Sequence, residues 1–149
     1  MNYIIPNDNL HQHECPLAVI KCVDWRFRQS DQEFIEKGLG FAHFDLYAWP
    51  GSGKEIINGN GFKKTFVDKI VQVSKNLHQI KKILLLWHHD CGAYGGFKAF
   101  ASAGAEEEQY QKDLRAAKDM LAAELPIELE IIMAYSQPGP QGLEYIVLE

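Results

Sequence analysis

Hydrophobic residues along the chain alternate between short apolar runs and segments with a helical repeat. The short runs are typical of strands buried on one or both faces, and they lie at residues 17–20, 44–48, 83–87 and 129–135. A weaker run at residues 143–148 predicts a last edge strand. Because residues 83–87 form the most strongly apolar run, we expect that strand at the centre of the sheet.

Three segments between these runs predict helices. Ser30 followed by Glu33 is the capping-box signature of a short helix, which we expect to end near Gly38 and Gly40. The apolar face of a second helix recurs at steps of three and four residues, at Phe62, Phe66, Ile70, Val73 and Leu77. A third helix, ended by Pro126, is marked by Tyr110, Leu114, Ala117 and Leu121.

Strands that alternate with helices predict βαβ units, and therefore an α/β fold with a mostly parallel sheet flanked by helices on both faces. The length of 149 residues suits one domain, which we place at residues 17–149. Residues 1–16 form an N-terminal segment that we expect to be mobile. Its alternating triplet of His11, His13 and Cys15 could bind a metal, but an uncommitted terminus with a spare thiol explains it as well.

The composition narrows the class of protein. With 46% hydrophobic and 23% charged residues, the domain can bury a core without a disulfide or a structural metal. A net charge of −5 with scattered lysines argues against a nucleic-acid partner. We find no signal-peptide pattern, and no apolar run approaches the roughly 20 residues that span a bilayer. We therefore expect a cytoplasmic protein without a membrane segment, whose three cysteines are thiols or metal ligands.

Candidate metal ligands follow two of the predicted strands. Cys22 comes after the first strand, and His88 and Cys91 come after the central one. Ligands of parallel sheets bind beyond the carboxyl ends of the strands, where these residues would meet. Two sulfurs and one imidazole nitrogen suit zinc and leave its fourth position open, as in catalytic sites. The alternative is two buried cysteines and a histidine with an ordinary hydrogen bond.

Asp24 and Arg26 add to this pattern. In an extended segment they would project to the same side as Cys22, where the carboxylate and the guanidinium would pair. Such a pair is usually a plain salt bridge. Beside zinc, however, the carboxylate can accept a proton from metal-bound water or occupy the open coordination position itself.

The combination Cys-x-Asp-x-Arg and His-x-x-Cys-Gly resembles the β-class carbonic anhydrases. The resemblance is carried by Cys22, Asp24, Arg26, His88, Cys91 and Gly92, and residues 131–148 resemble the closing strand pair of that family. It implies one zinc ion per chain, bound by Cys22, His88 and Cys91, in a homodimer or a higher homo-oligomer. It also implies reversible hydration of carbon dioxide to bicarbonate by zinc-bound hydroxide. Asp24 would orient the hydroxide or close the site, and Arg26 would hold Asp24.

The chain departs from the family at the stretch after the second strand, where Arg-Asn-Ala-Gly is replaced by residues 48–51, Ala-Trp-Pro-Gly. This change in the wall of the expected substrate pocket leaves two alternative functions open: a hydrolase of carbonyl sulfide or carbon disulfide, and a non-catalytic zinc-binding homologue. Trp25 is expected to pack in the interior, or else to narrow access to the metal. His89 either carries protons to solvent or is a structural histidine.

Other signals near the site have ordinary explanations. Residues 51–54 lack the flanking residues of a phosphate-binding loop, and Cys91 lacks the arginine that a phosphatase loop needs six positions later. Asp90 could accept a hydrogen bond from a neighbour of a ligand or cap the helix that follows it, and we favour the cap. The acidic run at residues 106–108 lies near a helix start, where negative charge is favourable without any further function.

Overall fold

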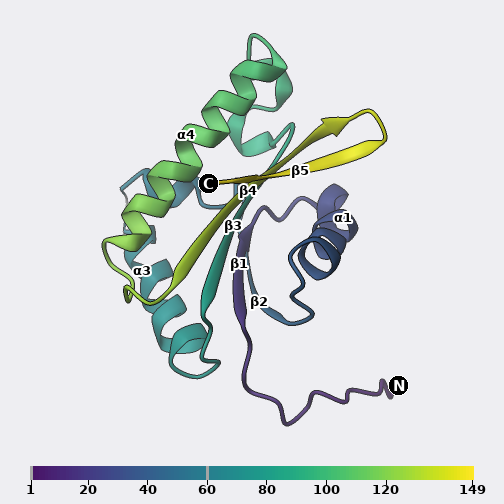
Figure 1. Ribbon diagram of the computed structural model, residues 1–149, viewed down its shortest axis with the longest axis vertical. Helices are drawn as coiled ribbons and strands as arrows, with labels where there is room; N and C mark the ends of the chain where they lie inside the picture. Colours follow the sequence, from purple (N-terminus) through teal and green to yellow (C-terminus); the bar gives the residue numbers. More distant parts are fainter. Residues whose placement is uncertain (1, 60) are drawn as a thin grey trace.

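A five-stranded sheet lies between two layers of helices in the computed structural model, which describes residues 2–59 and 61–149 (Figure 1). The strand order is β2-β1-β3-β4-β5, so β3 is central as predicted. Neighbouring strands are parallel except for the last pair, β4 and β5. The strands are β1 (Leu17–Lys21), β2 (Phe44–Ala48), β3 (Lys82–His88), β4 (Glu130–Gly139) and β5 (Gly142–Leu148). The predicted α/β fold is confirmed.

Helices cover both faces of this sheet, with α3 and α4 on one face and α1 on the other (Figure 1). The α-helices are α1 (Arg28–Glu33), α2 (Lys54–Ile57), α3 (Phe62–Lys69) and α4 (Ala103–Ala122). Short 3-10 helices are η1 (Trp25–Phe27), η4 (Gly92–Tyr94) and η5 (Phe97–Ala99), and wider π-helical segments are η2 (Phe34–Gly38) and η3 (Ile70–Lys75).

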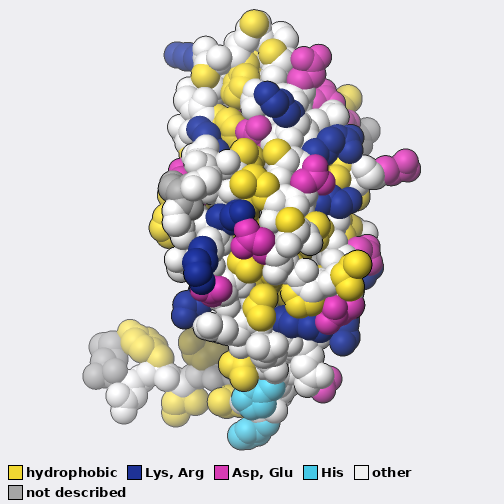
Figure 2. All heavy atoms as spheres, turned by 90° about the vertical axis from the view of Figure 1, so that its left-hand side faces the viewer, with side chains coloured by type: hydrophobic (Ala, Val, Ile, Leu, Met, Phe, Trp, Pro, Cys, Tyr) yellow, Lys and Arg dark blue, Asp and Glu magenta, His cyan; other side chains and the backbone are white. Residues whose placement is uncertain are grey.

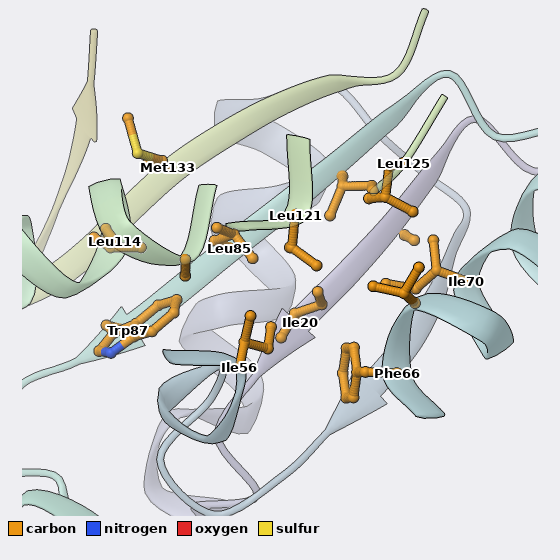
Figure 3. Close-up of a cluster of buried hydrophobic side chains, with 14 of the residues drawn as sticks. Ile20, Ile56, Phe66, Ile70, Leu85, Trp87, Leu114, Leu121, Leu125 and Met133 are labelled. Carbon is orange, nitrogen blue, oxygen red and sulfur yellow. The ribbon is translucent and has the colours of Figure 1, made fainter. Parts of the chain in front are cut away.

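Alternate residues of the central strands supply the two halves of the core. Ile20, Leu85 and Trp87 face α3 and α4, where they pack with residues such as Leu114 and Leu121 (Figure 3). The intervening residues face α1, and this second cluster contains Leu17, Val19, Leu84, Leu86 and Ile35. Burial on both faces explains why β1 and β3 are continuous apolar runs in the sequence.

The helix expected from the capping box begins earlier than predicted, so that prediction is wrong. The chain turns helical at Trp25, and the Asp24 side chain accepts a hydrogen bond from the backbone N–H of Arg26 at 3.0 Å. Ser30 lies inside α1, where its hydroxyl donates to the carbonyl of Phe27 at 3.2 Å. A serine inside a helix satisfies its hydroxyl in this way, so the Ser30 signature did not mark a helix start.

The apolar face expected over residues 62–77 holds only in its first half. Phe66 and Ile70 are buried, whereas Leu77 is 62% exposed and Ser74 is buried instead. The chain widens into the π-helical segment η3, which rotates the following side chains away from the sheet. The side chain of Phe62 lies outside the described residues. In α4, by contrast, all four predicted positions are buried, namely Tyr110, Leu114, Ala117 and Leu121.

The surface over α3 and α4 mixes charges of both signs, with basic and acidic side chains interspersed (Figure 2). Among the described residues, no helix combines the length and the apolar character needed to cross a membrane. Residues 2–14 run away from the sheet (Figure 1). The mobility of that segment stays a prediction.

Candidate metal centre

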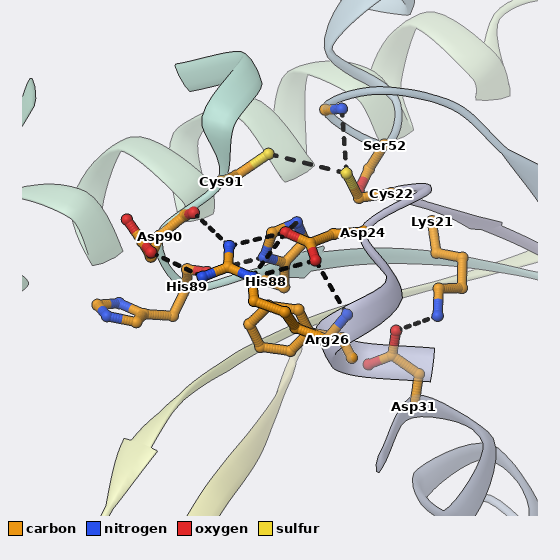
Figure 4. A network of polar contacts seen from close by, with 12 residues as sticks. Lys21, Cys22, Asp24, Arg26, Asp31, Ser52, His88, His89, Asp90 and Cys91 are labelled. Carbon is orange, nitrogen blue, oxygen red and sulfur yellow. Dashed lines mark hydrogen bonds and ion pairs between the residues drawn. The ribbon is translucent and has the colours of Figure 1, made fainter. Parts of the chain in front are cut away.

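The ends of β1 and β3 bring two cysteines and a histidine together (Figure 4). Cys22 follows β1, His88 is the last residue of β3, and Cys91 lies in the next turn. The Sγ atoms of the two cysteines are 4.0 Å apart, and all three donor atoms lie within 4.8 Å of one another. All three residues are buried. Within the described part of the chain, this is the one His/Cys/Asp/Glu group whose donor atoms converge in this way.

The polar atoms of this cluster fit a zinc ion. The Nδ1 atom of His88 lies 2.7 Å from the carbonyl oxygen of His89, to which it donates its proton. The Nε2 atom is therefore left with its lone pair, and it is buried without a hydrogen-bond partner. Two thiolates bound at about 2.3 Å in a tetrahedron would lie about 3.8 Å apart, close to the sulfur separation seen here. The cluster is compatible with one zinc site.

Of the three ligands, Cys22 is the one whose charge state favours metal binding. A hydrogen bond from the Cys91 thiol lowers the pKa of Cys22, and the backbone N–H of Gly51 also donates to this sulfur at 3.4 Å. The same hydrogen bond, together with burial, raises the pKa of Cys91, so the two sulfurs share one proton. Burial lowers the pKa of His88, but the neighbouring Cys22 sulfur, the His89 carbonyl and the Asp24 carboxylate together outweigh this effect, and the net shift is upward.

Asp24 lies beside the cluster in a fixed orientation. Its Oδ2 atom is 4.0 Å from the Nε2 atom of His88. The guanidinium of Arg26 donates to both carboxylate oxygens, from Nε at 3.1 Å and from Nη2 at 2.7 Å. This hydrogen bonding lowers the pKa of Asp24, which is therefore charged at neutral pH. The pairing expected from the sequence is present, but it arises at the start of η1 rather than in an extended segment.

Arg26 has a second carboxylate partner, Asp90. Its Nη1 atom donates to Oδ2 of Asp90 at 2.9 Å, and its Nη2 atom donates to the Asp90 carbonyl at 3.1 Å (Figure 4). The other oxygen of Asp90 accepts from the backbone N–H of Phe97, the first residue of η5, at 2.8 Å. Asp90 thus caps η5 and not the nearer helix η4, whose start has no side-chain cap.

A pocket of about 410 Å³ opens beside the cluster, lined by Cys22, Asp24, Trp25, Arg26, Gly51 and Gly92 among others. Trp25 is 82% exposed at this pocket, so the expectation that it packs in the interior is wrong. The reason is local: η1 buries Phe27, whose ring centroid lies 4.2 Å from that of His88, and this turns Trp25 outward.

The His89 side chain points away from the two cysteines (Figure 4) and does not line this pocket. Its side chain lines a different cavity, of about 460 Å³, together with Phe97 and Glu106. Nδ1 of His89 is hydrogen-bonded to the carboxylate of Glu106. A role for His89 in proton transfer stays a prediction.

Sequence reasoning missed Glu106. The acidic run at residues 106–108 suggested a solvated helix start, but Glu106 is only 3% exposed and contacts the turn between the predicted ligands. The buried pair of Lys21 and Asp31, one on each side of η1, was missed as well. Glu106 and the Lys21–Asp31 pair were both missed because they depend on contacts between segments that come together only in the folded chain.

The geometry agrees with comparisons to known proteins. A family model described as "Putative carbonic anhydrase" matches residues 12–138. The chain is a divergent β-carbonic-anhydrase-like member of this family.

Relatives of this carbonic-anhydrase-like chain occur in Rickettsia. An uncharacterized protein of Rickettsia conorii is 30% identical over 129 residues, which cover 82% of this chain and 68% of the relative. A second, from Rickettsia bellii, is 29% identical over 120 residues, with 76% and 72% covered. Among solved structures, β-carbonic anhydrase isoform I of Trichomonas vaginalis matches with a TM-score of 0.53 at 13% identity, over 98% of this chain and 88% of that one. At this identity the match establishes the fold.

Proposed function

We propose that this protein catalyses the reversible hydration of carbon dioxide to bicarbonate at a zinc ion held by Cys22, His88 and Cys91. The observation that carries the proposal is the buried, unpartnered Nε2 atom of His88, within 4.8 Å of both cysteine sulfurs. An unpaired buried acceptor is costly unless a ligand completes it. The family and the fold of the chain support the same function.

The zinc ion and the side chains around it would have different roles in the reaction. Bound zinc would supply Lewis-acid activation of water, lowering its pKa to about 7. Asp24 orients the reacting water by accepting its hydrogen bond, because its charged carboxylate faces the cluster. Arg26 keeps Asp24 in that orientation through its paired hydrogen bonds. These bonds engage both oxygens of Asp24, which favours a role in orienting the water over a role in closing the site by binding the metal.

The pocket suits a small apolar substrate. Val23, Trp25, Pro50 and Ala93 contribute apolar surface next to Cys22 and Asp24. Carbon dioxide would enter along this apolar surface, and bicarbonate would leave by the same opening.

The surroundings of the site support an oligomer and a reducing compartment. Val23 and Trp25 are 54% and 82% exposed beside the pocket, a surface that a second copy would cover in a homodimer or larger assembly. The free thiols of Cys22 and Cys91 need a reducing setting, which supports a cytoplasmic protein.

Stopped-flow hydration of carbon dioxide on metal-quantified protein between pH 6.5 and 9 tests the proposal, around a zinc-water pKa of about 7. Turnover that scales with one zinc per chain is the expected result. Pro50, which replaces the usual family residue, lines the pocket beside the retained Gly51 and favours carbonyl sulfide and carbon disulfide as the substrates to assay in parallel. Sulfide release with negligible carbon dioxide turnover would replace the proposal with a hydrolase. Full zinc without any turnover would indicate a non-catalytic homologue.

A further inference from the structure

A buried carboxylate from α4 holds the turn that follows β3. Glu106 is 3% exposed, and its Oε1 atom accepts hydrogen bonds from the backbone N–H of Asp90 at 2.8 Å and from the hydroxyl of Tyr110 at 2.9 Å. Its Oε2 atom accepts from Nδ1 of His89. The Tyr110 hydroxyl in turn accepts from the backbone N–H of Cys91 at 3.4 Å. Each residue from His89 to Cys91 therefore makes a bond to Glu106 or to its partner.

The turn needs such support because its backbone is unusual. Asp90 has a φ of 56°, in the left-handed region that few residues other than glycine adopt. A conformation of this kind persists only where the surroundings hold it. Glu106 binds Asp90 at its N–H, and Arg26 binds the same residue at its carbonyl and its carboxylate, at 3.1 and 2.9 Å. Asp90 thereby connects α4 to the pair formed by Arg26 and Asp24.

Stabilising the start of α4 does not explain Glu106. Ser102 already caps this helix by accepting a hydrogen bond from the N–H of Ala105 at 3.1 Å. An exposed acidic residue in the first turn would interact with the helix dipole without the cost of burying a carboxylate. The burial of Glu106 is accounted for by its three donors, two of which come from the turn between His88 and Cys91.

We propose that Glu106 is a positioning residue of the metal centre. By fixing the backbone of residues 89–91, it keeps the donor atoms of His88 and Cys91 directed at Cys22 before the ion binds. This inference rests on the zinc site of the proposed function, but not on its turnover. Partners that orient metal ligands typically change metal affinity by about 10–100-fold when they are removed, and we expect a loss in this range for Glu106→Ala.

The test measures metal binding in the full-length chain. Zinc affinity is determined by competition with a chromophoric chelator, the ligand geometry by the absorption spectrum of the Co²⁺-loaded protein, and the folding of each metal-free variant by urea titration. Glu106→Gln keeps an oxygen for the N–H of Asp90 and should restore most of the affinity lost in Glu106→Ala. Glu108→Ala is the matched control, because Glu108 lies on the same helix but is exposed.

The expected result is weakened zinc binding and an altered Co²⁺ spectrum in Glu106→Ala, with Glu106→Gln closer to the wild type and Glu108→Ala unchanged. Wild-type affinity and spectrum in folded Glu106→Ala would overturn the proposal. If Glu106→Ala does not fold, Glu106→Asp replaces it, because the shorter carboxylate cannot reach both His89 and Asp90. Weakened zinc binding in Glu106→Asp would then support the proposal, and wild-type affinity and spectrum would overturn it. Wild-type protein that binds no zinc would overturn this inference and the proposed function together. Zinc binding without carbon dioxide hydration would overturn only the latter.

Discussion

The Nε2 atom of His88 and the Oδ2 atom of Asp24 lie 4.0 Å apart, although they come from the ends of different strands. His88 is fixed by the carbonyl of His89, and Asp24 is fixed by Arg26. The orientation of each side chain is therefore set by a hydrogen-bond partner other than the facing residue. The two atoms face each other across the cluster, and the first two predictions concern metal binding and the role of Asp24.

Removing a thiol from the cluster should weaken zinc binding. Cys22→Ser replaces a sulfur whose pKa is lowered by the Cys91 thiol with a hydroxyl that does not ionise at neutral pH. We expect elemental analysis of the purified variant to find less than one zinc per chain. The wild type should lose about 2.7 kcal/mol of unfolding free energy when a chelator removes zinc present at 100 times its Kd.

Cys15→Ser is the matched control for this prediction. Cys15 is only partly buried, and its thiol donates to the carbonyl of Leu17 at 3.3 Å, so it takes no part in the cluster. It should retain one zinc per chain. Full zinc in Cys22→Ser would remove this cysteine from the ligand set.

Replacing the carboxylate of Asp24 should separate zinc binding from turnover. Asp24→Asn keeps the shape of the side chain but removes the charge that accepts a hydrogen bond from the reacting water. Loss of a positioned proton acceptor typically costs about 10²-fold or more in rate. We expect this fall in kcat for carbon dioxide hydration by stopped flow, with zinc content unchanged. Wild-type kcat in the variant would mean that Asp24 is not part of the mechanism.

The cluster could be predicted from the sequence because parallel strands align their carboxyl ends. Once β1 and β3 were identified as buried runs, the residues after them had to meet at one edge of the sheet. Glu106 could not be found in this way. It reaches Asp90 only because α4 packs across the sheet, and the acidic run around it is typical of an exposed helix start.

Local sequence patterns gave wrong predictions where two nearby residues could take the same structural role. Asp24 and Ser30 are both good helix caps, and the chain uses Asp24 because that residue also pairs with Arg26. Trp25 was expected to pack in the interior, but Phe27 takes the buried position of η1. The widening of the helix after Lys69 left no signal in the apolar spacing.

Breaking the buried ion pair behind the site should strongly destabilise the fold. Lys21 and Asp31 are 8% and 2% exposed and form an ion pair, and the Tyr145 hydroxyl also donates to Asp31 at 2.8 Å. Asp31→Ala leaves a buried ammonium without its partner, which typically costs about 3–5 kcal/mol. We expect a loss of this size in urea unfolding of the metal-free protein.

The double variant Lys21→Met with Asp31→Ala separates the cost of an unpaired charge from the value of the pair. It should recover much of the lost stability, because no unpaired charge remains. Equal stability of Asp31→Ala and the wild type would show that water reaches Lys21 in the folded protein.

Alkaline pH should weaken the fold through its buried tyrosines, and Tyr135 offers a direct measure. Burial, together with the hydrogen bond to Glu107, raises the pKa of Tyr135 to about 12. The pKa in the unfolded chain is about 10, so above that pH the unfolded state releases a proton that the folded state retains. The contribution of Tyr135 is therefore complete below pH 10 and is lost as the pH rises toward 12.

At pH 8, Tyr135→Phe should cost about 1 kcal/mol for the lost hydrogen bond. We expect urea unfolding to show this difference shrinking between pH 8 and pH 11, with the other tyrosines cancelling in the comparison, and a constant difference would contradict the raised pKa.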